Sequence, residues 1–93
     1  MMNRNWIQRI ADGIELDSEI LPMLPIIEIA GDKRVLIERH RGITEYTGDR
    51  IGISVPFGTV YICGNGLEIT RMSGEQLVIS GRIEIVQLHR RCG

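Results

Sequence analysis

Residues 33–88 read KRVLIERHRGITEYTGDRIGISVPFGTVYICGNGLEITRMSGEQLVISGRIEIVQL, and this stretch decides the fold. Apolar pairs that skip one position recur along it sixteen residues apart, at Val35/Ile37, Ile51/Ile53, Leu67/Ile69 and Ile83/Ile85. Between them stand Ile43/Glu45, Val60/Ile62 and Leu77/Ile79, at a spacing of seventeen. Alternation with a period of two is typical of short strands with one buried face, and Gly at most of the joints supplies turns.

This alternation predicts an all-β domain, an antiparallel meander of about seven or eight short strands in one curved sheet. The expected strands lie at 26–29, 33–38, 42–47, 50–55, 58–63, 66–71 and 75–88, the last bending or breaking at Gly81. A small β-solenoid with a coil of 16–17 residues is the alternative, because it would stack the same residues in columns. The short turns, rich in Gly, Asn and Asp, favour the meander.

The period also predicts which side chains share the buried face: Val35, Ile37, Ile51, Ile53, Val55, Val60, Ile62, Leu67, Ile69, Leu77, Ile79, Ile83 and Ile85. Four apolar side chains fall among the polar residues of the other face: Leu36, Tyr46, Tyr61 and Val78. They indicate that this second face is partly covered, by an N-terminal helix, by curling of the sheet or by another chain.

The N-terminal segment has a different spacing of apolar residues. Trp6, Ile7, Ile10 and Ile14 recur at helical spacing, which predicts a short amphipathic helix. The chain therefore divides into an N-terminal segment with a Pro-containing connector at 1–22 and a β domain at 23–93. A helix this short needs a surface to lie on. That surface is either the domain's own sheet or a membrane or partner, and the few basic residues on the polar side favour the sheet.

Composition excludes several classes of function. The 93 residues carry eleven basic and twelve acidic side chains, with no basic face of the kind that binds nucleic acid. The only aromatic residues are Trp6, Tyr46, Phe57 and Tyr61, too few for base stacking in a single-strand binder. No apolar run is long enough to span a bilayer and no signal peptide is recognisable, which predicts a cytoplasmic protein or one peripheral to a membrane.

Catalytic and metal-binding patterns are also missing from the sequence. Cys63 and Cys92 form neither a disulfide framework nor a metal motif. His40 lies in the charged turn Glu38-Arg39-His40-Arg41-Gly42, without the orienting carboxylate, nucleophile or further ligands that catalysis or metal binding needs. A histidine exposed on the surface is the expected state. The sequence therefore predicts no enzyme, no cofactor and no metal.

Three segments resemble a known family, the YabP/YqfC family of bacterial sporulation proteins. Residues 37–43, IERHRGI, are similar to its Ile-Glu-Asn-His-Arg-Gly segment, with Arg39 where the family usually has Asn. Residues 58–69, GTVYICGNGLEI, resemble its Gly-x-Leu-x-Ile-x-Gly-x-x-Leu-x-Ile pattern, and residues 77–83, LVISGRI, resemble its closing Leu-x-Ile-x-Gly-x-Ile. The likeness spans about residues 24–88 and is strongest to YqfC-type members.

This resemblance implies a non-enzymatic sporulation protein in the mother-cell cytoplasm, acting as a structural or interaction component at the membrane around the forespore. It also implies a membrane-protein partner encoded nearby. The expected partner-binding residues are Trp6, Ile7, Ile10, Ile14, His40, Arg41 and Gly42. A self-assembling β scaffold, a homo-oligomer whose sheet edges pair between copies, is the alternative. A module for a small ligand or nucleic acid is the second alternative.

Overall fold

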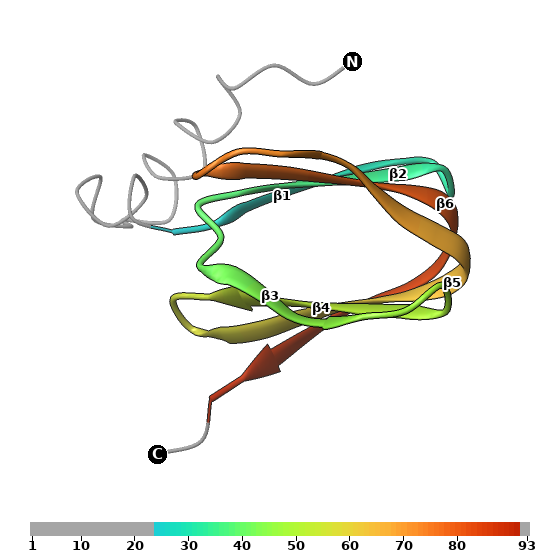
Figure 1. The fold of residues 1–93 in the computed structure, drawn as a ribbon. Helices are drawn as coiled ribbons and strands as arrows, with labels where there is room; N and C mark the ends of the chain where they lie inside the picture. The colour runs from blue at the N-terminus through green and yellow to red at the C-terminus, as the bar shows by residue number, and fades with distance from the viewer. Residues whose placement is uncertain (1–23, 92–93) are drawn as a thin grey trace, which may run out of the picture.

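The computed structural model describes residues 24–91, which form six antiparallel strands in a single sheet (Figure 1). The strands are β1 (Ile26–Ala30), β2 (Arg34–Glu38), β3 (Gly42–Tyr46), β4 (Arg50–Val55), β5 (Gly58–Met72) and β6 (Gln76–Arg90). The prediction of an all-β, antiparallel, one-sheet domain is thus confirmed. The predicted N-terminal helix lies outside the described residues.

The strand number and order differ from a simple meander. The sheet order is β1-β2-β6-β5-β4-β3, so β2 pairs with β6 and the chain crosses over between β2 and β3. The expected strands 58–63 and 66–71 are one long strand, β5, because Gly64-Asn65-Gly66 carries shifts in register instead of a reversing turn. Since all neighbouring strands run antiparallel, the solenoid is excluded.

The single sheet is folded over on itself into two layers. β1 pairs with β2, and β2 pairs with the first half of β6. In the same way, β3 pairs with β4, and β4 pairs with the first half of β5. The long β5–β6 hairpin curves round one side and belongs to both layers (Figure 1). We call the layer with β1 and β2 the upper layer and the layer with β3 and β4 the lower layer.

The space between the layers holds the hydrophobic core, which is entirely aliphatic. Its buried side chains are Val35, Ile37, Ile51, Ile53, Val55, Val60, Ile62, Leu67, Leu77, Ile79 and Ile83. All of them belong to the predicted buried face. Ile69 is partly buried against the core, whereas Ile85 is 54% exposed. Ile85 was predicted to be buried, and this was wrong: the register shift between Cys63 and Gly64 turns Ile85 to the outer side.

Close backbone contact marks the bend of the β5–β6 hairpin. Gly81 has a φ of +140°, and a Cβ atom there would lie 2.6 Å from the carbonyl oxygen of Gly66. A Cβ atom on Gly64 would collide with the carbonyl oxygen of Arg82. Glycine at these two positions lets the two strands bend round the core in contact with each other.

The hairpin turns of both layers hold this bend through equivalent hydrogen bonds. In each layer, two amides of a long strand donate to carbonyl groups of the turn that precedes β2 or β4. The donor–acceptor pairs are Ile83 N to Asp32 O (2.7 Å), Gly81 N to Lys33 O (3.1 Å), Leu67 N to Gly48 O (2.8 Å) and Gly64 N to Asp49 O (3.0 Å). The two acceptor turns are sixteen residues apart, and the donors sixteen or seventeen.

The repeat in the sequence therefore reports an internal pseudo-twofold arrangement. β1, β2 and the first half of β6 correspond to β3, β4 and the first half of β5. Val35 in β2 corresponds to Ile51 in β4, and each faces the core. The spacing of sixteen residues therefore separates equivalent strands in the two layers. It does not separate alternate strands of a simple meander or stacked coils of a solenoid.

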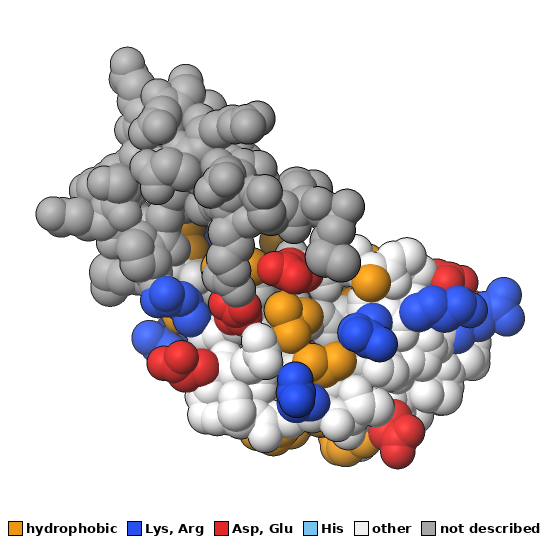
Figure 2. Space-filling model, turned by 90° about the horizontal axis from the view of Figure 1, so that it is seen from above, with side chains coloured by type: hydrophobic (Ala, Val, Ile, Leu, Met, Phe, Trp, Pro, Cys, Tyr) orange, Lys and Arg blue, Asp and Glu red, His pale blue; other side chains and the backbone are white. Residues whose placement is uncertain are grey.

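Two of the spare apolar residues lie side by side on the outer face of the upper layer. Leu36 pairs with Val78, and both are half-buried. Figure 2, which looks onto the molecule from above, shows hydrophobic side chains surrounded by charged ones on this face. Within residues 24–91, there is no helix of the length and apolarity needed to cross a membrane.

The two tyrosines are accounted for by contacts of other kinds. The Tyr61 ring lies on the outer face of the lower layer with the Arg50 guanidinium 4.1 Å from its centroid, a cation–π contact. The Tyr46 hydroxyl accepts a hydrogen bond of 3.0 Å from the Ile69 amide, which links β3 to the far part of β5. Curling of the sheet thus explains Tyr46, since it brings β5 over the end of β3.

Candidate functional site

The crossover from β2 to β3, residues 38–42, carries the most specific part of the sequence. It leaves the upper layer at Glu38 and enters the lower layer at Gly42. Arg39 adopts a left-handed conformation with a φ of 65° and Gly42 has a φ of +127°. These two residues turn the chain out of one layer and into the other, because φ is positive at both.

His40 is buried at the centre of this crossover, with 9% of its surface exposed. The Gly42 amide donates to Nδ1 at 3.2 Å, so the ring hydrogen sits on Nε2 and is donated to the Ser73 carbonyl at 3.0 Å. The expectation of a histidine exposed on the surface is therefore wrong. Both ring nitrogens are committed to backbone groups, and the ring ties the crossover to the β5–β6 turn.

Backbone hydrogen bonds extend this tie to both layers. The Arg39 amide donates to the Glu75 carbonyl and the Arg41 amide to the Ser54 carbonyl, each at 2.7 Å. The Arg41 side chain is exposed and Gly42 is half-buried. Of the three predicted crossover residues, only Arg41 thus presents its side chain to solvent, while His40 and Gly42 shape the backbone around it.

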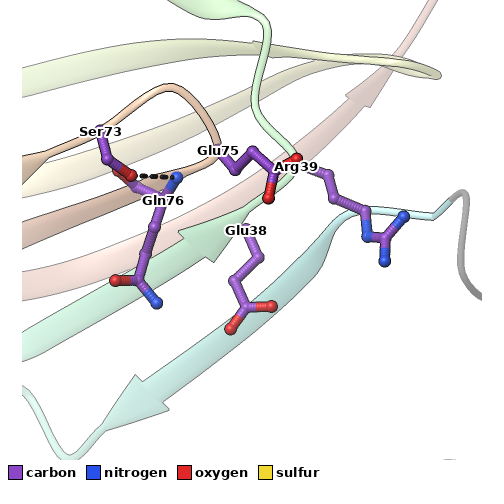
Figure 3. Close-up of a pocket in the computed structure, with 5 residues that line it drawn as sticks. All are labelled: Glu38, Arg39, Ser73, Glu75 and Gln76. Atoms are coloured by element: carbon purple, nitrogen blue, oxygen red, sulfur yellow. Dashed lines mark hydrogen bonds between the residues drawn. The ribbon is translucent and has the colours of Figure 1, made fainter.

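A polar cleft of about 280 Å³ opens between the crossover and the β5–β6 turn. It is lined by Glu38, Arg39, Ser73, Glu75 and Gln76 (Figure 3). The turn is held by Ser73, whose amide donates to the Gln76 carbonyl at 2.7 Å and whose hydroxyl accepts from the Gln76 amide at 3.1 Å. Glu38 and Gln76 are directly paired and project to the same side.

The cleft combines two carboxylates, a guanidinium, an amide and a hydroxyl group. These groups are suited to hydrogen bonding with a polar protein surface. Within residues 24–91, no three His, Cys, Asp or Glu side chains gather as metal ligands. The turn residues Ser73, Glu75 and Gln76 were not predicted as site residues, since they are more than thirty positions from His40 and no motif links them.

The partner-binding residues predicted in the N-terminal segment are not among the residues that the structure describes. These residues are Trp6, Ile7, Ile10 and Ile14. The candidate site therefore consists of the crossover, the β5–β6 turn and the cleft between them.

Replacing Arg39 with Asn should stabilise the fold. Asn tolerates the left-handed region better than Arg, and its short side chain can hydrogen-bond locally. We expect the free energy of unfolding to rise by about 0.5–1 kcal/mol, measured from the urea midpoint. Arg41→Asn, at an exposed position with an ordinary φ, should bring no such gain. An equal change in both variants would mean that the Arg39 backbone is not strained.

Comparison of the sequence with known proteins shows which family it is similar to. The sequence model of the YabP family matches residues 25–92, which include all six strands and the crossover. The chain is also 24% identical over 82 residues to YqfC, an uncharacterised protein of Bacillus subtilis strain 168, covering 88% of this chain and 85% of the relative. No solved structure gave a significant match.

Proposed function

The chain belongs to the YabP family, and from this we propose that it is a non-enzymatic sporulation protein whose β domain is a structural or interaction component. The observation that carries the proposal is the extent of the family match, which covers the whole sheet and the His40 crossover. The relative YqfC is uncharacterised, and no activity is carried over from it.

The proposed place of action is the mother-cell side of the membrane that surrounds the developing spore. The proposed partner is a membrane protein encoded nearby. Two surfaces would serve it. One is the crossover, where the Arg41 side chain is exposed, Arg39 lines the polar cleft and His40 is hydrogen-bonded to the β5–β6 turn. The other is the apolar set Trp6, Ile7, Ile10 and Ile14, for which the helical spacing of the sequence is the only support.

The apolar set can be tested in sporulating cells with the full-length protein. In Trp6→Ala/Ile10→Asp, we expect an unchanged unfolding transition of the β domain but loss of localisation and of capture of the membrane partner. The reason is that the substitutions remove the aromatic side chain of the proposed contact and place a charge in it. Localisation of a fluorescent fusion and a pull-down from the same cells measure both effects.

Gln8→Ala/Asp12→Ala is the matched control, because it changes the opposite side of the same segment. It should localise as the wild type does. Unchanged localisation and spore yield in Trp6→Ala/Ile10→Asp would remove the N-terminal segment from the proposal. Normal spores in a strain without the whole protein would contradict the sporulation role itself.

A further inference from the structure

The second half of β6, residues 84–90, forms an open edge of the lower layer, and we call it the β6 edge. Its neighbour on one side is β5, and within residues 24–91 no strand pairs on the other side. Residues 85–90 pair with 58–63 without a break in register. The β6 edge is therefore a regular strand edge that is ready to accept another strand.

The other open edges are protected by features that oppose such pairing. β1 is five residues long and follows Pro25, while β3 is five residues long and interrupted by a register shift between Ile43 and Glu45. The second half of β5 has a register shift between Ile69 and Arg71. Short length, proline and bulges are the usual protection of natural edges. Residues 85–90 of the β6 edge contain no proline and no register shift, since the shift falls at Glu84, before them.

The pattern of hydrogen bonds between β5 and β6 shows which backbone groups of the β6 edge point toward the open side. The Arg91 backbone amide donates to the Phe57 carbonyl at 2.9 Å, and this pair continues the register of residues 85–90. In an antiparallel ladder, alternate residues bond to the neighbour and those between them point away. The amide and carbonyl groups of Val86, Leu88 and Arg90 therefore face away from β5 and toward the open side.

Two large apolar side chains on this edge are exposed. Leu88 is 58% exposed although it pairs with Val60, which is completely buried in the core. Ile85 is 54% exposed on the outer face, opposite Cys63. The inner face of the lower layer thus continues beyond the core at Leu88, and a further strand would bury it.

The regular part of the edge, IVQLHR at 85–90, can pair with itself, and Glu84 stands at the register shift that precedes it. In the single chain the Glu84 carboxylate accepts a hydrogen bond of 3.5 Å from Asn65 Nδ2. If two copies pair antiparallel about Gln87, Val86 stands opposite Leu88 of the second copy, and Arg90 comes next to Glu84 of the second copy. Both pairs occur twice because of the twofold symmetry. A shift by two residues in one direction would instead place Arg90 opposite Arg82, and in the other direction opposite Val86. Opposite charges and apolar pairs across strands are the stabilising ones.

We propose that the β6 edge is the dimer interface of this protein, with a second copy of the chain as its occupant and Gln87 on the twofold axis. The lower layers of two copies join into one continuous sheet, and Leu88 becomes covered. This inference rests on the edge alone, so it stands or falls independently of the proposed role in sporulation.

Charge reversal at the edge tests the proposal with purified full-length protein. The wild type should dimerise with rising concentration in sedimentation equilibrium. Arg90→Glu and Glu84→Arg should each weaken the dimer on the order of tenfold, because each variant creates two like-charge pairs. The double variant Glu84→Arg/Arg90→Glu should regain the wild-type affinity. Mixing the two single variants should give a heterodimer in which both charge pairs are complementary.

Arg71→Glu is the control for net charge, since Arg71 is exposed in the part of β5 that belongs to the upper layer. It should dimerise as the wild type does. Circular dichroism checks that every variant remains folded. A wild type that stays monomeric at high micromolar concentration would overturn the proposal, and so would a dimer that ignores the charge reversals.

A cysteine at the axis gives a second, independent test. Residues that face each other at a non-hydrogen-bonded position have Cα atoms about 4.5 Å apart, within reach of a disulfide. Gln87→Cys in a Cys63→Ser/Cys92→Ser background should therefore form an oxidised dimer on a non-reducing gel. Glu45→Cys on the β3 edge should not. A dimer band for Glu45→Cys and none for Gln87→Cys would place the interface elsewhere and contradict the proposal.

Discussion

Gly81→Ala is expected to lower the free energy of unfolding by about 3 kcal/mol or more. Two effects act together at this position. The φ of +140° is a conformation that residues with a side chain rarely adopt, and the new Cβ atom would lie 2.6 Å from the Gly66 carbonyl oxygen. The obstacle is backbone, which cannot rotate away as a side chain can, so the β5–β6 hairpin would have to open at its bend. Urea unfolding measures the loss.

Gly74→Ala is the matched control, because its Cβ atom would meet nothing within 4 Å and its φ is ordinary. It should stay within about 0.5 kcal/mol of the wild type. Gly64→Ala should resemble Gly81→Ala, and the effects of the two should not add, since both obstruct the same close approach. A Gly81→Ala protein as stable as the control would show that the strands do not touch at the bend.

His40→Ala should destabilise the fold by about 2–3 kcal/mol, chiefly because the Ser73 carbonyl and the Gly42 amide would lose their partners in a part-buried place. Beyond this loss, hydrogen exchange should accelerate at the amides of the crossover and the β5–β6 turn before it does in the core strands. That pattern is expected because the ring joins these two segments across 33 positions of sequence.

His40→Gln and Arg41→Ala separate the structural role of this ring from a role of the exposed surface. Glutamine keeps one donor and one acceptor, so it should lose less stability than alanine does. Arg41→Ala should leave stability within about 0.5 kcal/mol, since the side chain is exposed and the backbone bond to Ser54 remains. A destabilisation by Arg41→Ala equal to that of His40→Ala would contradict this division.

The core could be predicted from the sequence because it depends on a local rule. Side chains alternate along each strand, so an apolar residue such as Val35 or Ile53 shares its face with the residue two positions away. Every buried aliphatic side chain of the described sheet obeys this rule. Ile85 departs from it, since the register shift near Gly64 is set by contact with β5 and leaves no mark in the alternation.

The candidate site could be predicted only in part. The crossover stood out because a charged turn replaced a plain Gly or Asn turn, and the family resemblance was most specific there. Burial of His40 was missed because its two partners are backbone groups, which any sequence supplies. The left-handed φ of Arg39 was missed as well, since arginine itself gives no signal for that conformation.

The sequence by itself determined that this chain forms antiparallel strands, where β1 to β4 lie to within one residue at either end, and which side of each is buried. These features follow from interactions between residues a few positions apart. Tertiary structure alone decided that β2 pairs with β6, that the sheet folds into two equivalent layers, and that none of the strands within residues 24–91 pairs along the β6 edge. The reason is that strand pairing joins residues distant in the chain, and an alternating pattern fits several partner strands equally well. The choice among them is made when the turns at Asp32-Lys33 and Gly48-Asp49 accept hydrogen bonds from the bend of the β5–β6 hairpin.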